Sequence, residues 1–122
     1  MKTAIIILGH GSLCKGADTA AKRIAAEIEK IGKYEIVQHA FLRYTGPTAD
    51  EALERCIQQN VEKIVIVPFF LQSGTHVAKD IPDFVVKATK LYPSIAFDVT
   101  EFIGTHLMLK EIVLDLINEK AS

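Results

Sequence analysis

The alternation of apolar and polar positions predicts four strands and four helices in turn. Short runs of apolar and β-branched residues are typical of buried strands, and they occur at 4–8, 35–41, 63–67 and 95–99. Apolar residues at helical spacing predict helices at about 18–31, 48–60 and 80–92, and from near 105 onward. A long loop, 68–79, is expected between the third strand and the third helix.

Capping residues sharpen some of these boundaries. Gly32 is suited to end the first helix, and Thr48 with Glu51 forms a capping-box pattern at the start of the second. Pro82 is expected in the first turn of the third helix, where proline is tolerated. The last helix carries an apolar stripe made of Leu109, Ile112, Val113, Leu116 and Ile117.

The order of elements predicts an α/β fold. Because a helix separates each strand from the next, the strands should be parallel and joined by right-handed crossovers. We therefore expect residues 1–122 to form one three-layer domain. Its four-stranded parallel sheet should have the order 2-1-3-4, with helices on both faces.

Composition narrows the class of protein. The chain has 122 residues, of which 49% are hydrophobic, so it can form one domain with a substantial core. A net charge of −1 argues against a nucleic-acid partner, and no apolar run is long enough to span a membrane. Cys14 and Cys56 form no Cys-x-x-Cys motif, which disfavours redox or structural-zinc roles and fits reduced thiols in the cytoplasm.

Two loops are expected to carry the chemistry. Ligands of parallel sheets bind at the carboxyl ends of the strands, where the strand order reverses, here between the first and third strands. The loops leaving those strands, 9–12 and 68–76, contain His10 and His76. Neutral imidazole binds divalent metals and accepts protons near neutrality. Two histidines leave a metal ion open to further ligands, which suits transfer of the ion rather than permanent binding.

The other candidate residues carry weaker signals. His39 is expected to be structural because it lies inside a strand, and His106 to cap the last helix or face solvent. Ser12 lacks the Gly-x-Ser-x-Gly context of a nucleophile elbow. The Gly-x-Gly at 9–11 is only a fragment of a dinucleotide fingerprint, and Cys14 is interpreted as an ordinary thiol.

Several segments make the chain resemble the short CbiX-type sirohydrochlorin chelatases of the class II, ATP-independent chelatase superfamily. The matching segments cover almost the whole chain in order: Leu8–Ser12, Phe69–Val77 and Asp80–Pro82, with weaker matches at Ala40–Leu42, Pro47–Thr48 and Phe102–His106. The Gly-x-His-Val-x-x-Asp-Ile-Pro stretch is the specific part of this pattern.

This resemblance implies a metal chelatase of tetrapyrrole and cobalamin biosynthesis. The implied reaction is insertion of a divalent metal ion into sirohydrochlorin, with Co²⁺ first and Ni²⁺ or Fe²⁺ as alternatives, and no permanently bound cofactor. His10 would be the proton acceptor and a metal ligand, and His76 the second metal ligand. A single-domain chain would form a homodimer with the active site between its subunits.

The implied substrate site includes one departure from the family. A glutamate often follows the second strand in the family, whereas this sequence has Arg43 there. Arginine cannot bind metal, but its planar fork can clamp a substrate carboxylate, and a solvated loop arginine is the simpler alternative. The residues expected to contact the macrocycle are Gly11, Ser12, Arg43, Thr45, Leu71, Gln72, Ser73, Gly74 and Thr75.

The sequence also allows other functions. The domain could be a non-catalytic carrier of a metal or a tetrapyrrole, which the replacement of glutamate by Arg43 favours. It could also be a flavodoxin-like ligand-binding or regulatory module. A hydrolase using Ser12 would need a supporting carboxylate at a recognisable spacing, and none is evident.

Overall fold

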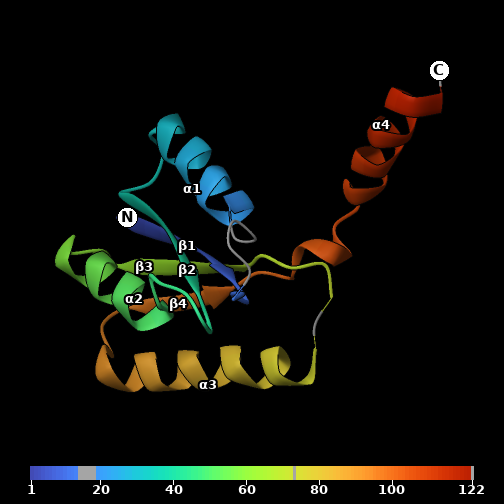
Figure 1. Cartoon of the computed structure of the whole chain (residues 1–122). Helices are drawn as coiled ribbons and strands as arrows, with labels where there is room; N and C mark the ends of the chain where they lie inside the picture. Colours follow the sequence, from blue (N-terminus) through green and yellow to red (C-terminus); the bar gives the residue numbers. More distant parts are fainter. Residues whose placement is uncertain (14–18, 73, 122) are drawn as a thin grey trace.

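The structure, a computed structural model, describes residues 1–13, 19–72 and 74–121, without the side chains of residues 75–77. Strands and helices alternate along the chain (Figure 1). The elements are β1 (Thr3–Gly9), α1 (Thr19–Ile31), β2 (Ile36–Phe41), α2 (Ala49–Gln58), β3 (Lys63–Pro68), α3 (Thr75–Leu91), β4 (Ala96–Val99), the 3₁₀ turn η1 (Ile103–Thr105) and α4 (Leu109–Ala121).

The sheet has the expected order and direction. It contains four strands in the order β2-β1-β3-β4, and every neighbouring pair is parallel. β1 lies in the centre, where Ile6 pairs with Gln38 of β2 and with Ile66 of β3. The strand order therefore reverses between β1 and β3, as the sequence predicts.

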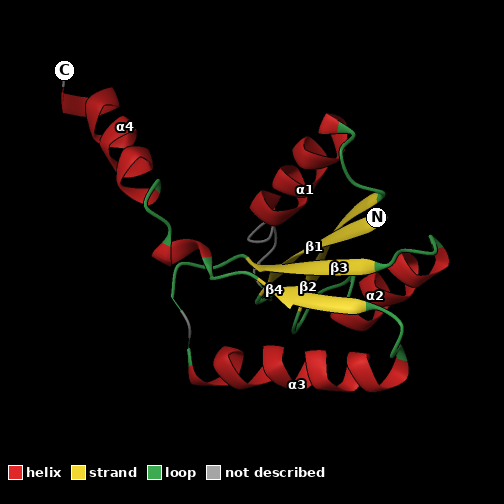
Figure 2. Cartoon of the chain, turned by 180° about the vertical axis from the view of Figure 1, so that it is seen from behind, coloured by secondary structure: helices red, strands yellow, loops and turns green. Residues whose placement is uncertain are grey.

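Each face of the sheet packs against its own helices (Figure 2). Ile6, Ile64 and Ile66 are almost fully buried on the face covered by α2 and α3. Ile5 and Ile7 point to the opposite face and pack against Ala21 and Ala25 of α1. β1 is buried on both faces, which explains its unbroken apolar run.

The capping box predicted for the second helix is present. The Thr48 hydroxyl accepts a hydrogen bond from the Glu51 backbone at 3.1 Å, and the Glu51 carboxylate accepts one from the Thr48 backbone at 3.0 Å. Two backbone N–H groups that the helix cannot pair are thereby satisfied, so α2 begins at Ala49.

The predicted start of the third helix is wrong. α3 begins at Thr75 rather than near Asp80, so Pro82 lies inside the helix instead of in its first turn. Gly74 is the N-cap and offers no side-chain cap, which hid the true start from sequence patterns. Proline removes one helical hydrogen bond, but burial of Ile81 and Ala88 against the sheet offsets that cost.

The last helix also departs from expectation. The chain first forms η1, and α4 begins at Leu109 rather than near Thr105. None of its described residues is buried, although the pattern predicts a packed apolar stripe. Both views show α4 extending away from the sheet (Figures 1 and 2). The apolar pattern correctly predicted the helix, but the expected packing of its stripe on the sheet is not found among the described residues.

The structure describes one of the two cysteines. Cys56 is a free cysteine inside the core, where burial raises the pKa of its thiol to about 12 and makes it unreactive. Cys14 lies outside the described residues.

Within the described ranges, no helix has the length and apolar character needed to cross a bilayer.

The difference in burial between Ile66 and Ile31 predicts different effects of replacing each isoleucine by alanine. Ile66→Ala should lower the free energy of unfolding by about 2–5 kcal/mol, because Ile66 is fully buried and its loss leaves a cavity. Ile31→Ala should change it by less than about 0.5 kcal/mol, since Ile31 is 70% exposed. Urea denaturation of both variants measures the difference, and equal losses would contradict the assignment.

Candidate functional site

Three loops meet at the carboxyl edge of the sheet because the strand pairing continues past the strand ends. The Leu42 backbone N–H donates to the Gly9 carbonyl, and that of Arg43 to the His10 carbonyl, both at 3.0 Å. On the other side of β1, the Phe69 N–H donates to the Leu8 carbonyl at 2.8 Å. The loops after β1, β2 and β3 are thus held at one edge.

Glycine is required where the first two loops touch. Gly11 has φ +95°, which L side chains rarely adopt. A Cβ atom built there would lie 1.8 Å from the Arg43 carbonyl oxygen, so a side chain cannot fit without moving the backbone. Glycine in the His10 loop therefore allows the His10 and Arg43 loops to pack directly together.

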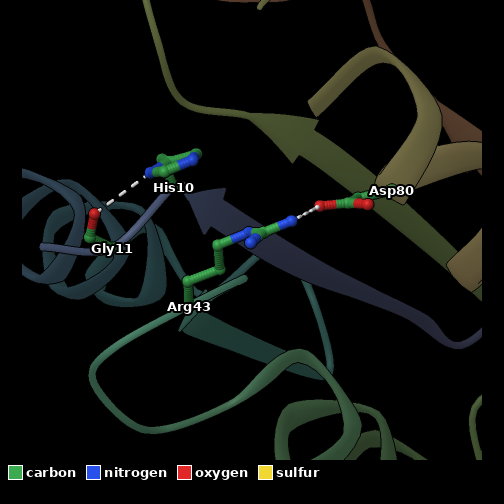
Figure 3. A network of polar contacts seen from close by, with 4 residues as sticks. All are labelled: His10, Gly11, Arg43 and Asp80. Carbon is green, nitrogen blue, oxygen red and sulfur yellow. Dashed lines mark hydrogen bonds and ion pairs between the residues drawn. The ribbon is translucent and has the colours of Figure 1, made fainter. Parts of the chain in front are cut away.

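His10 presents its imidazole at this edge. Its side chain is exposed, and Nδ1 lies 3.2 Å from the Gly11 carbonyl oxygen (Figure 3). In the tautomer protonated on Nδ1, that nitrogen donates to the carbonyl and Nε2 carries the lone pair. Such an arrangement directs Nε2 toward metal binding or proton acceptance.

Arg43 joins the second loop to α3. Its Nη2 lies 3.1 Å from Oδ2 of Asp80, and the two side chains are 41% and 30% exposed (Figure 3). Arg43 is therefore not a freely solvated loop residue, which was the simpler of the two sequence interpretations. Guanidinium has five N–H donors, so this ion pair leaves others for a further anion.

The third loop supplies the remaining predicted residues. Leu71 and Gln72 are exposed, and Gly74 precedes the first turn of α3, which contains Thr75 and His76. Ser73 and the side chains of Thr75 and His76 lie outside the described part of the structure. The backbone at His76 is one helical turn before Asp80, the partner of Arg43.

The first two loops contribute two more predicted residues. Ser12 and Thr45 are both half-buried. The Thr45 N–H donates to the Arg43 carbonyl at 2.8 Å, which closes a tight turn through Tyr44 at φ +70°. Thr45 thus supports the backbone that presents Arg43.

The other two histidines, His39 and His106, contact residues near them in the sequence. The His39 ring packs edge-on against Phe41, and its pKa is lowered by burial and by nearby Lys22 and Arg55. Nδ1 of His106 accepts a hydrogen bond from the Met108 N–H at 3.1 Å, just before α4. His106 is exposed and accepts this one hydrogen bond, in line with the expectation that it caps the last helix or faces solvent.

Sequence reasoning missed Asp80 as part of this site. The signal was present, because Asp80 follows His76 by four residues in the specific Gly-x-His-Val-x-x-Asp-Ile-Pro stretch. Interpreting 68–79 as loop hid the relation, since that spacing equals one helical turn only if the helix begins earlier.

The described side chains include no group of three or more His, Cys, Asp or Glu residues arranged to hold a metal ion. An ion at His10 would need ligands from outside that set, such as His76, water or a bound substrate. The arrangement suits transient handling of an ion at an exposed edge.

A protein-family model described as CbiX matches residues 4–120. The chain belongs to the CbiX family. A relative from Methanococcoides burtonii, named sirohydrochlorin cobaltochelatase, is 34% identical over 98% of this chain and 95% of its own length. The chloroplastic sirohydrochlorin ferrochelatase of Arabidopsis thaliana is 31% identical over 93% of this chain but 50% of its own length. The chain thus spans about half the length of many curated relatives it matches.

Solved structures agree with this assignment. The sirohydrochlorin chelatase SirB of Bacillus subtilis subspecies spizizenii, in complex with cobalt, superposes with a TM-score of 0.86 at 30% identity. It covers 99% of this chain, which matches 52% of SirB. A putative cobalamin biosynthesis CbiX protein from Marinobacter aquaeolei has a TM-score of 0.78 at 25% identity and matches over 97% of its length.

The close contact between the His10 and Arg43 loops predicts that replacing glycine by alanine destabilises the protein more at Gly11 than at Gly32. Gly32→Ala should lower the free energy of unfolding by about 1–2 kcal/mol, because Gly32 has a left-handed backbone. No steric cost is added, since nothing lies within 4 Å of a Cβ atom at that position. Gly11→Ala should lower the free energy of unfolding by ~1–3 kcal/mol more than Gly32→Ala does, since the new Cβ atom would collide with the Arg43 backbone. Chemical denaturation tests this, and equal costs would argue against tight packing of the loops.

Proposed function

We propose that this CbiX-family chain inserts a divalent metal ion into sirohydrochlorin without ATP, with cobalt as the first candidate ion. The observation that carries the proposal is the exposed His10 imidazole at the carboxyl edge of the sheet, beside the Arg43–Asp80 ion pair. Relatives named as sirohydrochlorin cobaltochelatases and ferrochelatases support the reaction class and leave iron as an alternative ion.

The reaction requires an ion to lose water and two pyrrole nitrogens to lose protons. His10 and His76 hold the incoming ion on one face of the macrocycle. As the ion passes to the pyrrole nitrogens, the released Nε2 of His10 accepts one pyrrole proton and the second proton passes to water. Proton transfer to a positioned base contributes roughly 10²–10⁴ in rate. The chain of contacts from His10 through Arg43 to Asp80, one turn after His76, supports bringing the two histidines to one site.

Arg43 binds an acidic side chain of the macrocycle in this proposal. Sirohydrochlorin carries several carboxylates, and guanidinium binds carboxylate through parallel hydrogen bonds. The ion pair with Asp80 holds the Arg43 side chain in place while leaving other N–H groups free to bind the substrate. Gly11, Ser12, Thr45 and the 71–75 loop form the rest of the proposed macrocycle surface.

The alternative is a carrier that binds the metal or tetrapyrrole without turnover. It is favoured by Arg43, which stands where the resemblance to the family implies a glutamate able to bind metal or accept a proton. Multiple turnovers in a cobalt-insertion assay separate the chelatase from the carrier, which would stop at one equivalent.

We further propose that two copies pair to complete the site, and that the protein acts in the cytoplasm. This chain spans about half of relatives such as SirB, so two copies would provide a similar amount of structure. The free thiol of buried Cys56 agrees with a reducing compartment.

The proposal predicts the effect of removing either histidine. His10→Ala and His76→Ala should each reduce anaerobic cobalt insertion into sirohydrochlorin by roughly 100-fold or more, because each removes a metal ligand and His10 also removes the base. His39→Gln is the matched control, since His39 packs against Phe41 within the fold. Absorbance of the macrocycle follows the reaction, and circular dichroism verifies folding. Full activity in both alanine variants would exclude this mechanism.

The proposed role of Arg43 predicts a change in KM rather than in kcat. Arg43→Lys keeps the charge but loses the planar fork, so KM for sirohydrochlorin should rise about 10-fold while kcat stays within about twofold. Arg55→Lys is the control, because Arg55 contacts Gln38 on the strand β2. A fall in kcat at constant KM would assign Arg43 to the chemical step instead.

A further inference from the structure

The loop after β2 contains a strained turn centred on Tyr44. The Thr45 backbone N–H donates to the Arg43 carbonyl at 2.8 Å, and Tyr44 between them has φ +70°. A hydrogen bond between residues two apart, with a positive φ at the central residue, defines a rare and strained type of γ-turn. A bulky side chain is unfavourable there, because its Cβ atom comes close to a carbonyl oxygen. Glycine would fill this position at lower cost.

The described residues include one other non-glycine residue at positive φ, and its backbone has a simple explanation. Asn60 has φ +56° just after α2, and asparagine tolerates this region because its short polar side chain can form local hydrogen bonds. Its backbone N–H donates to the Ile57 carbonyl at 3.0 Å. Tyrosine has no such preference for positive φ, so the strain at position 44 points to a task for its side chain.

The Tyr44 side chain does not stabilise the core. It is 62% exposed and belongs to neither cluster of buried and partly buried apolar residues. The other two tyrosines, Tyr34 and Tyr92, each pack against one of these clusters. An aromatic ring that leaves a strained turn for solvent gains little for folding, so its benefit lies in contact with a ligand.

Tyr44 lies at the carboxyl edge of the sheet, beside the candidate site. The turn begins at Arg43, whose N–H donates to the His10 carbonyl at 3.0 Å and whose guanidinium lies near the imidazole (Figure 3). The loop after β3 presents exposed Leu71, and the loop after β1 presents exposed Leu13. Each of the three loops at this edge thus exposes a large apolar side chain close to the polar groups of the site.

We propose that Tyr44 is a substrate-binding residue whose ring stacks on the flat, conjugated face of the macrocycle. The inference rests on the proposed function, because it takes the tetrapyrrole as the ligand. Aromatic rings stack favourably on flat π-systems, and tyrosine supplies a large apolar area while only two side-chain torsions become restricted. Adjacent residues then contact two features of one ligand, since Arg43 binds a peripheral carboxylate and Tyr44 contacts the ring system.

The γ-turn prepares Tyr44 for this contact. Its hydrogen bond holds the backbone on both sides of Tyr44 before the ligand arrives, so less conformational freedom is lost on binding. The strain in the turn is present with and without ligand, whereas the stacking contact forms only in the complex. Affinity and stability should therefore respond differently to substitutions at position 44.

Equilibrium dialysis of the full chain against metal-free sirohydrochlorin under anaerobic conditions tests the contact. Tyr44→Ala should raise Kd about 10-fold, and Tyr44→Phe should leave it within about twofold, because the ring rather than the hydroxyl group makes the contact. Leu91→Ala is the matched control, since Leu91 is 59% exposed but ends α3 at the opposite edge of the sheet. Unchanged binding in Tyr44→Ala, or equal losses in Tyr44→Ala and Tyr44→Phe, would overturn the proposal.

Glycine at position 44 separates the effect of the backbone from that of the ring. Tyr44→Gly and Tyr44→Ala both lose the ring, so both should bind the macrocycle about 10-fold more weakly than the unmodified chain. In urea denaturation, Tyr44→Gly should nevertheless have a folding equilibrium constant about 5-fold larger than Tyr44→Ala, since only glycine adopts φ +70° at little cost. A glycine variant no more stable than the alanine variant would contradict the strained turn on which the inference depends.

The same measurements distinguish failure of this inference from failure of the proposed reaction. If the unmodified chain binds no sirohydrochlorin, the proposed function fails and the role of Tyr44 fails with it. If the unmodified chain binds the macrocycle and inserts cobalt while Tyr44→Ala binds equally tightly, only the role of Tyr44 is excluded. Sedimentation velocity at the assay concentration provides the last comparison. A Tyr44→Ala variant that changes its oligomeric state but keeps its affinity would assign the ring to a contact between copies and overturn the proposal.

Discussion

The site depends on backbone pairing that continues beyond the ends of β1 and β2. The hydrogen bond from the Arg43 N–H to the His10 carbonyl extends the parallel ladder into two loops that differ in sequence and length. Because Gly11 lets the Arg43 backbone approach this closely, the imidazole and the guanidinium are presented from one small region. The chemistry at this edge therefore depends on main-chain geometry more than on contacts between the functional side chains.

The same constraint explains why Arg43 and α3 are linked. A guanidinium held beside His10 would repel an incoming divalent cation, and Asp80 neutralises part of that charge through the ion pair at 3.1 Å. At the same time the pair joins the β2 loop to the first turns of α3, where His76 lies in sequence. One exposed ion pair contributes little to overall stability, so its main effect here is on the local charge beside His10.

Local patterns predicted the fold well where each element packs within its own domain. Runs of apolar residues predicted the four strands, and their alternation with helices predicted the strand order. The capping box at Thr48 is a short-range motif, so its prediction needed no tertiary information. Errors arose where local rules compete with packing. Pro82 suggested a helix start, whereas burial of Ile81 and Ala88 extends the helix back to Thr75. In the candidate site, the sequence predicts His10 and Arg43, and their roles stay predictions; Asp80 joins them only once the helix start is corrected to Thr75.

The stripe on α4 shows a different limit of sequence patterns. Periodicity predicts that Ile112 and Leu116 are buried, but it cannot tell whether the covering surface belongs to the same chain. At the base of α4, Gly104 packs so closely on the Leu71 backbone that no Cβ atom would fit. The path of the chain into α4 is therefore determined by a tertiary contact, which the apolar periodicity of the helix does not encode.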